Sequence, residues 1–392
     1  MILIPNHHAI HNHPTMPQKQ YQLSLALLFA ALLSLNAAPA LTLLHYNVKG
    51  NGAANWNTNA AQVQAIGRQI LYLNPDVIAF NEIPVSQSYY MTNWTRSFLS
   101  NYNLVISPGS DTFIRSAIAS KFPITLSKSW LDGTNLSNFG YSGNFTRDLF
   151  EAQLAVPGYP QPLHVFTSHL KATTTNPQTD TNRRGAEAGA ISNFLVTVFL
   201  TTNSLHPYLL TGDLNEDIVR PGMNYISSLP IQRLLTAPTG LQLTTPANPF
   251  NGSELTLSIQ GTLDVRFDYI LPCTLLFSNI ASSQVFRTDL LPSPPAPLLA
   301  TDSVMASDHL PVVMTFNNPY DKPFQLLSFT RSNLTVTLNW QSVPGQPYRV
   351  EGSTNLTTWS TLANNLVATG STFTYATNLN DTARFFRVYR VP

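Results

Sequence analysis

Six short segments of the chain place polar side chains of metal-binding or acid–base type at or near the end of an apolar run. They are Asn47 after LLHY, Glu82 after VIAFN, His169 after LHVFTS, Asp213 and Asn215 in LLTGDLN, Arg266 and Asp268 in RFDYI, and Asp308 and His309 in ASDHLPV. Such runs predict buried strands, and strand ends meet at one rim of a sheet. We therefore expect these residues to form one site.

The residue types in this set suit the hydrolysis of a phosphodiester. A phosphodiester repels nucleophiles by its own charge. Its hydrolysis needs a hard cation held by carboxylate or amide oxygens, a group that activates water and a donor for the leaving oxygen. Glu82 is of the ligand type, Asp213 and His309 are of the activating type, and His169 is of the donor type. The sequence therefore predicts a metal-assisted hydrolase.

Most of these residues, taken singly, also have a structural explanation. Asn47 and Asn215 are typical turn residues, His169 fits a satisfied buried histidine, and Asp308 fits a cap before a strand. Glu82 is harder to explain in this way, because a carboxylate directly after VIAFN costs free energy unless it has a partner or water. The chemical interpretation rests on the set as a whole.

The surrounding patterns predict the elements that hold these residues. A strand over residues 41–48, a helix over 60–73 and a buried strand over 77–80 begin an α/β layered fold. Further strands are expected at 117–120, 152–156, 163–168, 208–211, 267–271 and 312–316, with a second helix over 183–200. This list fits a four-layer α/β sandwich, in which two packed sheets are flanked by helices, over residues 41–318. Short alternating strands with turn residues predict a small all-β, β-sandwich-like module over 319–392.

In this order, the segments resemble the endonuclease/exonuclease/phosphatase superfamily, which includes deoxyribonuclease I, and in particular its secreted bacterial nucleases. The matching pieces, spread over residues 41–316, are N-V-K at 47–49, N-E at 81–82, S-H-L at 168–170, G-D-L-N at 212–215, R-F-D-Y-I at 266–270 and S-D-H at 307–309. Many members have Gln before the metal-binding Glu, where this chain has Asn81. Asparagine also occurs there in the family.

The resemblance implies a metal site and a catalytic group. Glu82 would bind Mg²⁺, or Mn²⁺ or Ca²⁺, with Asn47 beside it and Asp308 sharing the role. Asp213 would orient or activate the attacking water. His309, paired with an acid such as Asp268, would either activate the water or stabilise charge on the phosphate.

The resemblance also implies contacts to the substrate. His169 would donate to the phosphate or to the leaving oxygen, and Asn215 would hold the phosphate. Arg147, before the next strand, resembles an arginine that supports the site. Arg183 at the start of the second helix is a candidate contact to a phosphate backbone, and its alternative is a solvated helix start.

The N-terminus predicts export. An apolar stretch of about 13 residues from Leu23 to Leu35 is too short to span a bilayer, follows Lys19 and precedes an A-x-A cleavage site at 38–40. We therefore expect residues 1–40 to be a signal peptide, with Met16 as the true start, and the protein to be secreted or periplasmic. The single cysteine, Cys273, excludes an internal disulfide. No later stretch predicts a membrane anchor.

The sequence favours nucleic acid as the substrate but leaves alternatives open. The run His169–Lys171 followed by Arg183 resembles extracellular nucleases that cleave DNA or RNA. Residues 41–318 carry a net charge of −3 and residues 319–392 a net charge of +3, so no basic stripe marks a tight DNA binder. A sphingomyelinase-like or inositol-phosphate hydrolase and a non-catalytic binding protein are the alternatives. The C-terminal module either binds a surface or secretion machinery or caps the fold.

Overall fold

The computed structural model describes residues 2–3, 40–50, 57, 59–87, 90–258, 262–378 and 385–391. The apolar segment of the predicted signal peptide and Met16 lie outside these residues. The chain divides into two compact units, Ala40–Pro319 and one that contains Tyr320–Pro392. Among the described residues, no helix combines the length and the hydropathy needed to cross a membrane.

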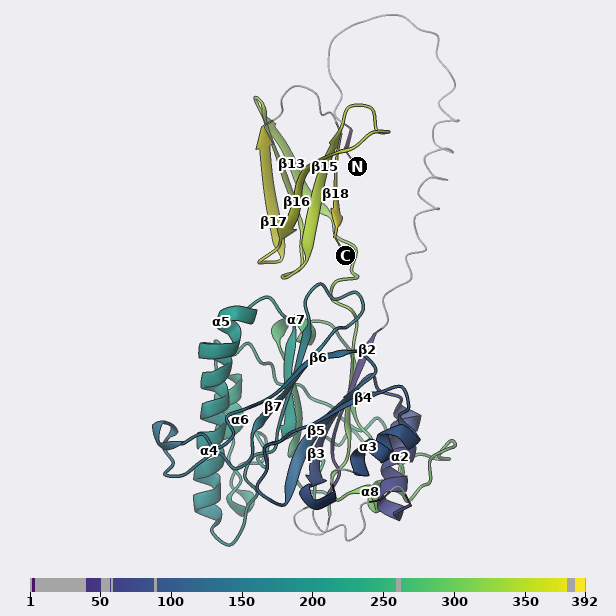
Figure 1. The fold of residues 1–392 in the computed structure, drawn as a ribbon, viewed down its shortest axis with the longest axis vertical. Coiled ribbons are helices and arrows are strands. Elements are labelled where there is room, and N and C mark those ends of the chain that lie inside the picture. The colour runs from purple at the N-terminus through teal and green to yellow at the C-terminus, as the bar shows by residue number, and fades with distance from the viewer. Residues whose placement is uncertain are drawn as a thin grey trace, which may run out of the picture. The chain divides into compact units, whose positions relative to one another are not determined.

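The first unit contains two β-sheets (Figure 1). The six-stranded sheet has the order β11-β12-β2-β3-β5-β4 and the five-stranded sheet the order β10-β9-β8-β7-β6. Within the sheets, only β2 with β3 and β8 with β9 run parallel among the described pairs. The bounds are β2 Leu41–Asn47, β3 Val77–Pro84, β4 Asn103–Ile106, β5 Ile114–Ser120, β6 Ile124–Trp130, β7 Leu149–Leu154, β8 Leu163–Ser168, β9 Tyr208–Asp213, β10 Asp268–Pro272, β11 Ile280–Val285 and β12 Val312–Phe316.

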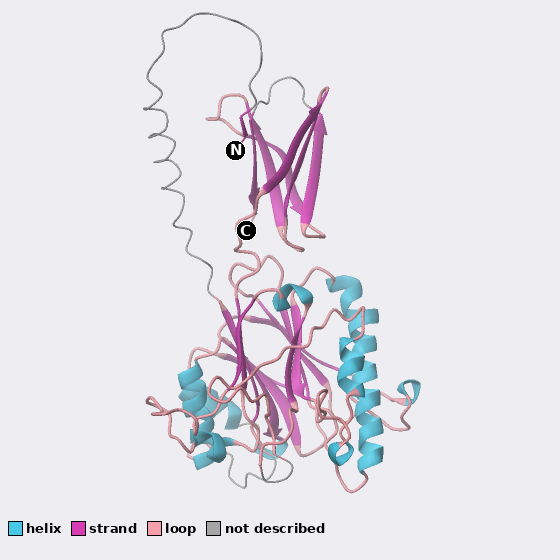
Figure 2. Ribbon diagram, turned by 180° about the vertical axis from the view of Figure 1, so that it is seen from behind, coloured by secondary structure: helices cyan, strands magenta, loops and turns pink. Residues whose placement is uncertain are grey.

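Helices cover the outer faces of both sheets (Figures 1 and 2). Helices α2 (Ala61–Leu73) and α3 (Tyr90–Phe98) pack on the six-stranded sheet through one apolar cluster, with α8 (Asp302–Ala306) beside α2. On the other side, α4 (Pro177–Phe194) continues through a π-helical turn (Leu195–Phe199) into α5 (Leu200–Asn203) and packs beside α6 (Leu229–Leu235). The short helix α7 (Thr274–Phe277) follows β10. This arrangement confirms the predicted α/β sandwich.

Strand periodicity decides which side chains lie between the sheets. Side chains alternate between the two faces of a strand. In β3, Ile78 and Phe80 pack outward with the helices, whereas Val77 and Ala79 belong to the cluster between the sheets. The same alternation directs His45 and Asn47 of β2 inward, because Leu44 and Tyr46 pack outward. The interior therefore becomes polar at one end, where the strands end.

The second unit is a small all-β sandwich, as the sequence predicted. One sheet has the order β13-β14-β17 and the other the order β1-β18-β15-β16. Their core contains Trp340, Tyr348 and Val350, all fully buried. The bounds are β1 Ile2–Leu3, β13 Leu326–Ser332, β14 Thr335–Gln341, β15 Pro347–Ser353, β16 Ser360–Val367, β17 Thr372–Asn378 and β18 Phe385–Arg390.

The structure extends the predicted elements and adds others. The second helix begins at Pro177 rather than at residue 183, because Pro at its first position fixes a helical φ and lacks only an N–H that is unpaired there in any case. Strands β4, β6, β11, β13 and β16 were not predicted. Their burial patterns are mostly intermediate or exposed, so they lack the apolar runs on which the prediction relied.

Gly212 is required by the close approach of β8 to β9. A Cβ atom at this position would lie 1.8 Å from the backbone oxygen of Ser168, which cannot rotate away. We expect Gly212→Ala to lower the free energy of unfolding by about 3 kcal/mol, the upper end of overpacking costs. Gly185→Ala in α4 is the control, because its nearest neighbour would lie 3.6 Å away. Denaturant unfolding measures both, and equal stability of the two variants would contradict this account.

Candidate active site

The predicted polar residues meet where the two parallel strand pairs end. Asn47 ends β2, Glu82 lies in β3, and Asp213 ends β9. Asp268 begins β10 opposite Asp213, and His309 precedes β12. Because the two sheets face each other, residues from both approach within hydrogen-bonding distance at this end.

Asp268 lies between two histidines. Its Oδ1 is 2.9 Å from His45 Nε2, and its Oδ2 is 2.8 Å from His309 Nδ1. Burial alone would raise the pKa of Asp268, but His309 and His45 hold it below its usual range. Burial likewise opposes the charge of His309, and the carboxylates of Asp268 and Asp213 override it and raise the pKa of His309 to about 10. The pair therefore keeps a protonated imidazole oriented toward the interior of the site.

The acidic part of the site joins both sheets. The Asn47 amide Nδ2 donates to Asp213 Oδ2 at 2.9 Å and to Glu82 Oε1 at 3.2 Å. Burial raises the pKa of Glu82, and it raises the pKa of Asp213 to about 7. His309 Nε2 lies 3.6 Å from Asp213 Oδ2. Asp213 thus lies between the carboxylate of Glu82 and the protonated imidazole of His309.

His169 contacts the same carboxylate from β8. Its Nε2 lies 3.3 Å from Asp213 Oδ2. Burial lowers the pKa of His169 well below its usual value, and the nearby charge of Arg147 lowers it further. Arg147 donates to the backbone oxygen of His169 at 2.9 Å and pairs with Asp111 at 2.6 Å. Arg147 therefore supports the loop that carries His169, in line with the supporting role that the resemblance implied.

Glu82 has an unusual backbone. Its φ is 63°, and the register between β3 and β5 shifts between Phe80 and Ile83 at this point. A β-bulge redirects a side chain, and a non-glycine residue at positive φ persists only where its surroundings hold it. The backbone oxygen of Glu82 accepts a hydrogen bond from Gly50 N at 2.8 Å. The bulge thus fixes the carboxylate at the site.

Asn215 follows the cluster in a left-handed conformation, with a φ of 52°. Its backbone N–H donates to Asp213 Oδ1 at 2.9 Å, and its side-chain amide donates to the Leu170 oxygen at 3.2 Å. The side chain is buried beside the site. Its predicted contact to phosphate stays a prediction.

Two predicted residues lie outside the buried cluster. Asp308 is 39% exposed and pairs with Lys49 at 2.8 Å, rather than joining Glu82 and Asp213. Arg183 donates to the Asn144 oxygen at 2.6 Å and lies 3.5 Å from Glu187. Because both charges already have partners, the structure adds no support for Asp308 as a ligand or for Arg183 as a substrate contact.

His45 was not predicted from the sequence, and Asn81 was predicted only as part of the N-E motif, without a role. His45 lies two residues before Asn47, and this spacing places both on one strand face, a signal that was available. Asn81 donates to Ser116 Oγ at 2.9 Å and to Thr167 Oγ1 at 3.2 Å, and its Oδ1 accepts from Asp213 N at 2.9 Å. It therefore joins the sheets behind the site. No local sequence pattern predicts this role of Asn81.

Helix α4 braces the loops that carry site residues. Glu187 is fully buried and accepts from Thr146 N at 2.8 Å and from Lys171 N at 2.9 Å. Arg184, also fully buried, donates to Glu216 at 2.5 Å and to the Lys171 oxygen at 3.0 Å. These contacts hold the chain next to Arg147, His169 and Asn215.

Loss of this brace is testable. Glu187→Ala leaves two partly buried backbone donors, Thr146 N and Lys171 N, without this acceptor, at up to about 1–3 kcal/mol each. We expect a lower unfolding temperature and a lower kcat for phosphodiester hydrolysis. Glu187→Gln keeps one acceptor oxygen and should lose less of both. Calorimetry and steady-state kinetics measure the effect, and an unchanged Glu187→Ala variant would refute the brace.

Residues 44–309 match the Endonuclease/Exonuclease/phosphatase family. The match covers more than half of the chain. The chain belongs to this family. The fold and the order of the site segments agree with it, so the resemblance seen in the sequence is confirmed.

Two solved structures described as endonuclease/exonuclease/phosphatase proteins share the fold. One from Beutenbergia cavernae has a TM-score of 0.50 at 13% identity and covers 90% of this chain and 100% of its own. One from Bacteroides vulgatus has a TM-score of 0.50 at 13% identity, and the match covers 71% of this chain and 98% of the other. Truncated Caenorhabditis elegans TDP2 has a TM-score of 0.48 at 16% identity, and the match covers 71% of this chain and 98% of the other. A search of curated proteins gives no match.

Members of the endonuclease/exonuclease/phosphatase family are generally phosphoester hydrolases and typically depend on a divalent metal. The site fits such an ion. Glu82, His169 and Asp213 each offer a ligand atom, and these atoms lie within 4.8 Å of one another. A cation between the carboxylates of Glu82 and Asp213 would offset the desolvation that raises their pKa values. Asn47 presents its amide nitrogen to them, and half a turn of the amide would present its oxygen instead.

Proposed function

We propose that the chain is a divalent-metal-dependent phosphodiesterase that acts as an endonuclease on DNA, with RNA as a second substrate to be tested. The observation that carries the proposal is the pairing of Asp268 with His309 at 2.8 Å beside the cluster of Asn47, Glu82 and Asp213. It combines a carboxylate-rich ligand set with an oriented acid–base pair. These are the parts that phosphodiester hydrolysis requires.

The protein's own residues have distinct roles in this proposal. Mg²⁺, Mn²⁺ or Ca²⁺ held by Glu82 with Asn47 would polarise the phosphate. Asp213, whose pKa is raised to about 7 by burial, accepts the proton of the attacking water. As the water oxygen bonds to phosphorus, the bond to the leaving oxygen breaks. The protonated His309, held by Asp268, stabilises the charge that develops on the phosphate.

Two of the remaining residues bind the substrate. Neutral His169 donates to the phosphate or to the leaving oxygen, and Asn215 holds a phosphate oxygen. Arg147 acts through the backbone of His169 and not on the substrate directly. We also propose that the signal peptide at residues 1–40 exports the protein and that the module at 319–392 binds a surface or secretion machinery.

Cleavage of plasmid and single-stranded DNA by the mature chain tests the proposal. Parallel reactions contain Mg²⁺, Mn²⁺, Ca²⁺ or EDTA, with RNA and bis(p-nitrophenyl) phosphate as further substrates. Metal-dependent nicking that EDTA abolishes is the expected result. EDTA-sensitive hydrolysis of the aryl diester without DNA cleavage would support a phosphodiesterase activity but indicate a lipid or inositol diester as the substrate. Inactivity on all substrates would refute the proposal and favour a binding protein.

A further inference from the structure

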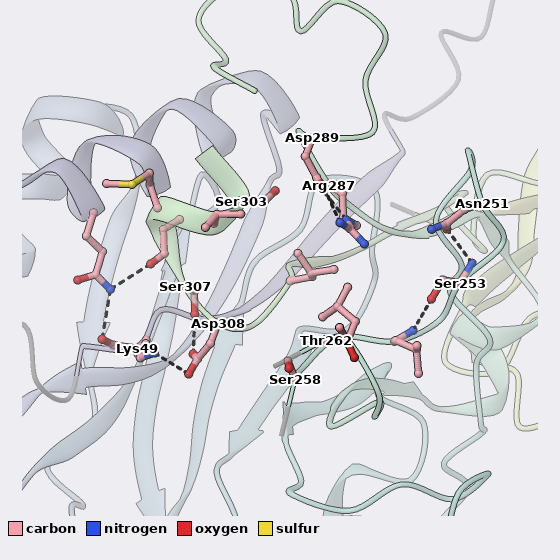
Figure 3. Close-up of a pocket in the computed structure, with 17 residues that line it drawn as sticks. Lys49, Asn251, Ser253, Ser258, Thr262, Arg287, Asp289, Ser303, Ser307 and Asp308 are labelled. Atoms are coloured by element: carbon pink, nitrogen blue, oxygen red, sulfur yellow. Dashed lines mark hydrogen bonds and ion pairs between the residues drawn. The ribbon is translucent and has the colours of Figure 1, made fainter. Parts of the chain in front are cut away.

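A cavity of about 970 Å³, whose lining residues are drawn in Figure 3, lies beside the turn that leads into His309. One wall is the turn from Ser307 to Asp308, directly before His309, and another is Lys49, two residues after Asn47. The Ser307 hydroxyl donates to the Asn47 backbone oxygen at 2.8 Å, so these two walls are joined through the site. Cavities of this size hold small molecules or parts of larger ones.

The third wall is hydrogen-bonded to the catalytic elements. Leu255 and Ser258 line the cavity and flank Thr256 and Leu257. The Thr256 hydroxyl accepts from Asp268 N at 3.2 Å, and the Thr256 backbone oxygen accepts from Leu310 N at 2.8 Å. A group attached to a phosphate at the site would therefore enter a cavity whose walls are fixed to the same residues.

The charges in the cavity are balanced. Among the described residues that line it, the cations are Lys49 and Arg287 and the carboxylates are Asp308 and Asp289. Lys49 pairs with Asp308 at 2.8 Å, and Arg287 pairs with Asp289, as the dashed lines in Figure 3 show. Each cation already has its counter-ion. The cavity therefore does not favour a run of phosphates, which is bound by unpaired Lys and Arg.

The rest of the lining suits an uncharged group with both polar and apolar parts. The Ser258 hydroxyl is buried without a hydrogen-bond partner, and the Asn251 amide uses its oxygen to accept from Ser253 N at 3.0 Å. Val304 and Met305 form an aliphatic edge and are 77% and 47% exposed. Buried hydroxyls without partners are uncommon, and a ligand is one way to satisfy them.

We propose that this cavity binds the nucleoside next to the scissile phosphate. The base and sugar supply acceptors and donors for Ser258 and Asn251, and the ring faces pack on Met305. Because a nucleoside must leave a base stack to enter a cavity of this kind, the enzyme would favour flexible single strands over intact duplex. The inference rests on the proposed function and deepens it by naming the group that the site selects.

Four diesters with the same p-nitrophenolate leaving group test the cavity. Water adds to phosphorus, the bond to the aryl oxygen breaks, and the released p-nitrophenolate is read by its colour. The other ester group is thymidine, attached through its 5′ or 3′ oxygen, methyl, or octyl. The expected result is a kcat/KM at least about tenfold higher for a thymidine diester than for the methyl diester, a difference of about two hydrogen bonds.

The double variant Asn251→Ala/Ser258→Ala isolates the cavity. It should lower kcat/KM for the thymidine diester by about fivefold or more and leave the methyl diester within about twofold. Ser127→Ala on β6, outside the cavity, should change neither substrate. Equal values for the four diesters, a preference for octyl, or an undiminished preference in the double variant would each overturn the nucleoside assignment and leave the proposed phosphodiesterase activity standing.

Binding is measured separately from hydrolysis. Titration calorimetry with thymidine 5′-monophosphate should show binding to the wild-type chain that weakens by about fivefold in the double variant. If the diesters are not hydrolysed but this difference is seen, the proposed function fails and the cavity assignment stands. Absent or equal binding in both proteins overturns the assignment.

Discussion

His309→Ala should lower kcat for metal-dependent phosphodiester hydrolysis by about 10³-fold, within the range for loss of a positioned acid–base group. The imidazole is held by Asp268 at 2.8 Å, and the two carboxylates around it raise its pKa to about 10. Its removal leaves the developing phosphate charge without a fixed donor. Single-turnover kinetics with bis(p-nitrophenyl) phosphate measure the loss without interference from product release.

A matched histidine outside the site serves as the control. His206 Nδ1 lies 2.9 Å from His164 Nε2. The other ring nitrogen of His164 contacts Glu151 of β7 in the five-stranded sheet. His206→Ala should keep kcat within about twofold, as expected for a residue without a catalytic contact. Circular dichroism should show both variants folded. A folded His309→Ala enzyme with wild-type kcat would remove His309 from the mechanism.

Glu82→Gln should weaken Mg²⁺ or Mn²⁺ binding by more than about 100-fold, because the change removes the charge of a ligand and keeps its shape. Glu82 is fixed by the bulge in β3, and one of its carboxylate oxygens lies within the group formed with His169 and Asp213. No other described carboxylate lies close enough to join that group. Titration calorimetry measures the affinity, and the metal-dependent rise in unfolding temperature should disappear with it.

Asp308→Asn separates two possible ligand sets. The resemblance to the family gave Asp308 a share in metal binding, whereas the structure pairs it with Lys49 at 2.8 Å on the surface. We expect Asp308→Asn to change metal affinity by less than about threefold, consistent with the small energies of exposed ion pairs. A loss as large as that of Glu82→Gln would show that Asp308 turns toward the ion on binding.

Much of the fold and most of the candidate residues could be predicted from the sequence. Buried strands such as β8 and β12 are rich in apolar residues, and a site residue lies next to one end of each: His169 follows β8 and His309 precedes β12. The ordered series of motifs was enough to indicate the family. Exposed strands such as β6 were missed because half-exposed strands lack that apolar run.

Only the tertiary structure decided how these residues are paired. His45 and Asp268 are 223 positions apart, and Asn47 and Asp213 are 166 positions apart, so no local periodicity relates them. Each pairing depends on the register of one sheet against the other. The same register places Asn81 behind the cluster and leaves Asp308 outside it. Sequence thus specified which side chains point inward, and the packing of the two sheets determined which of them meet.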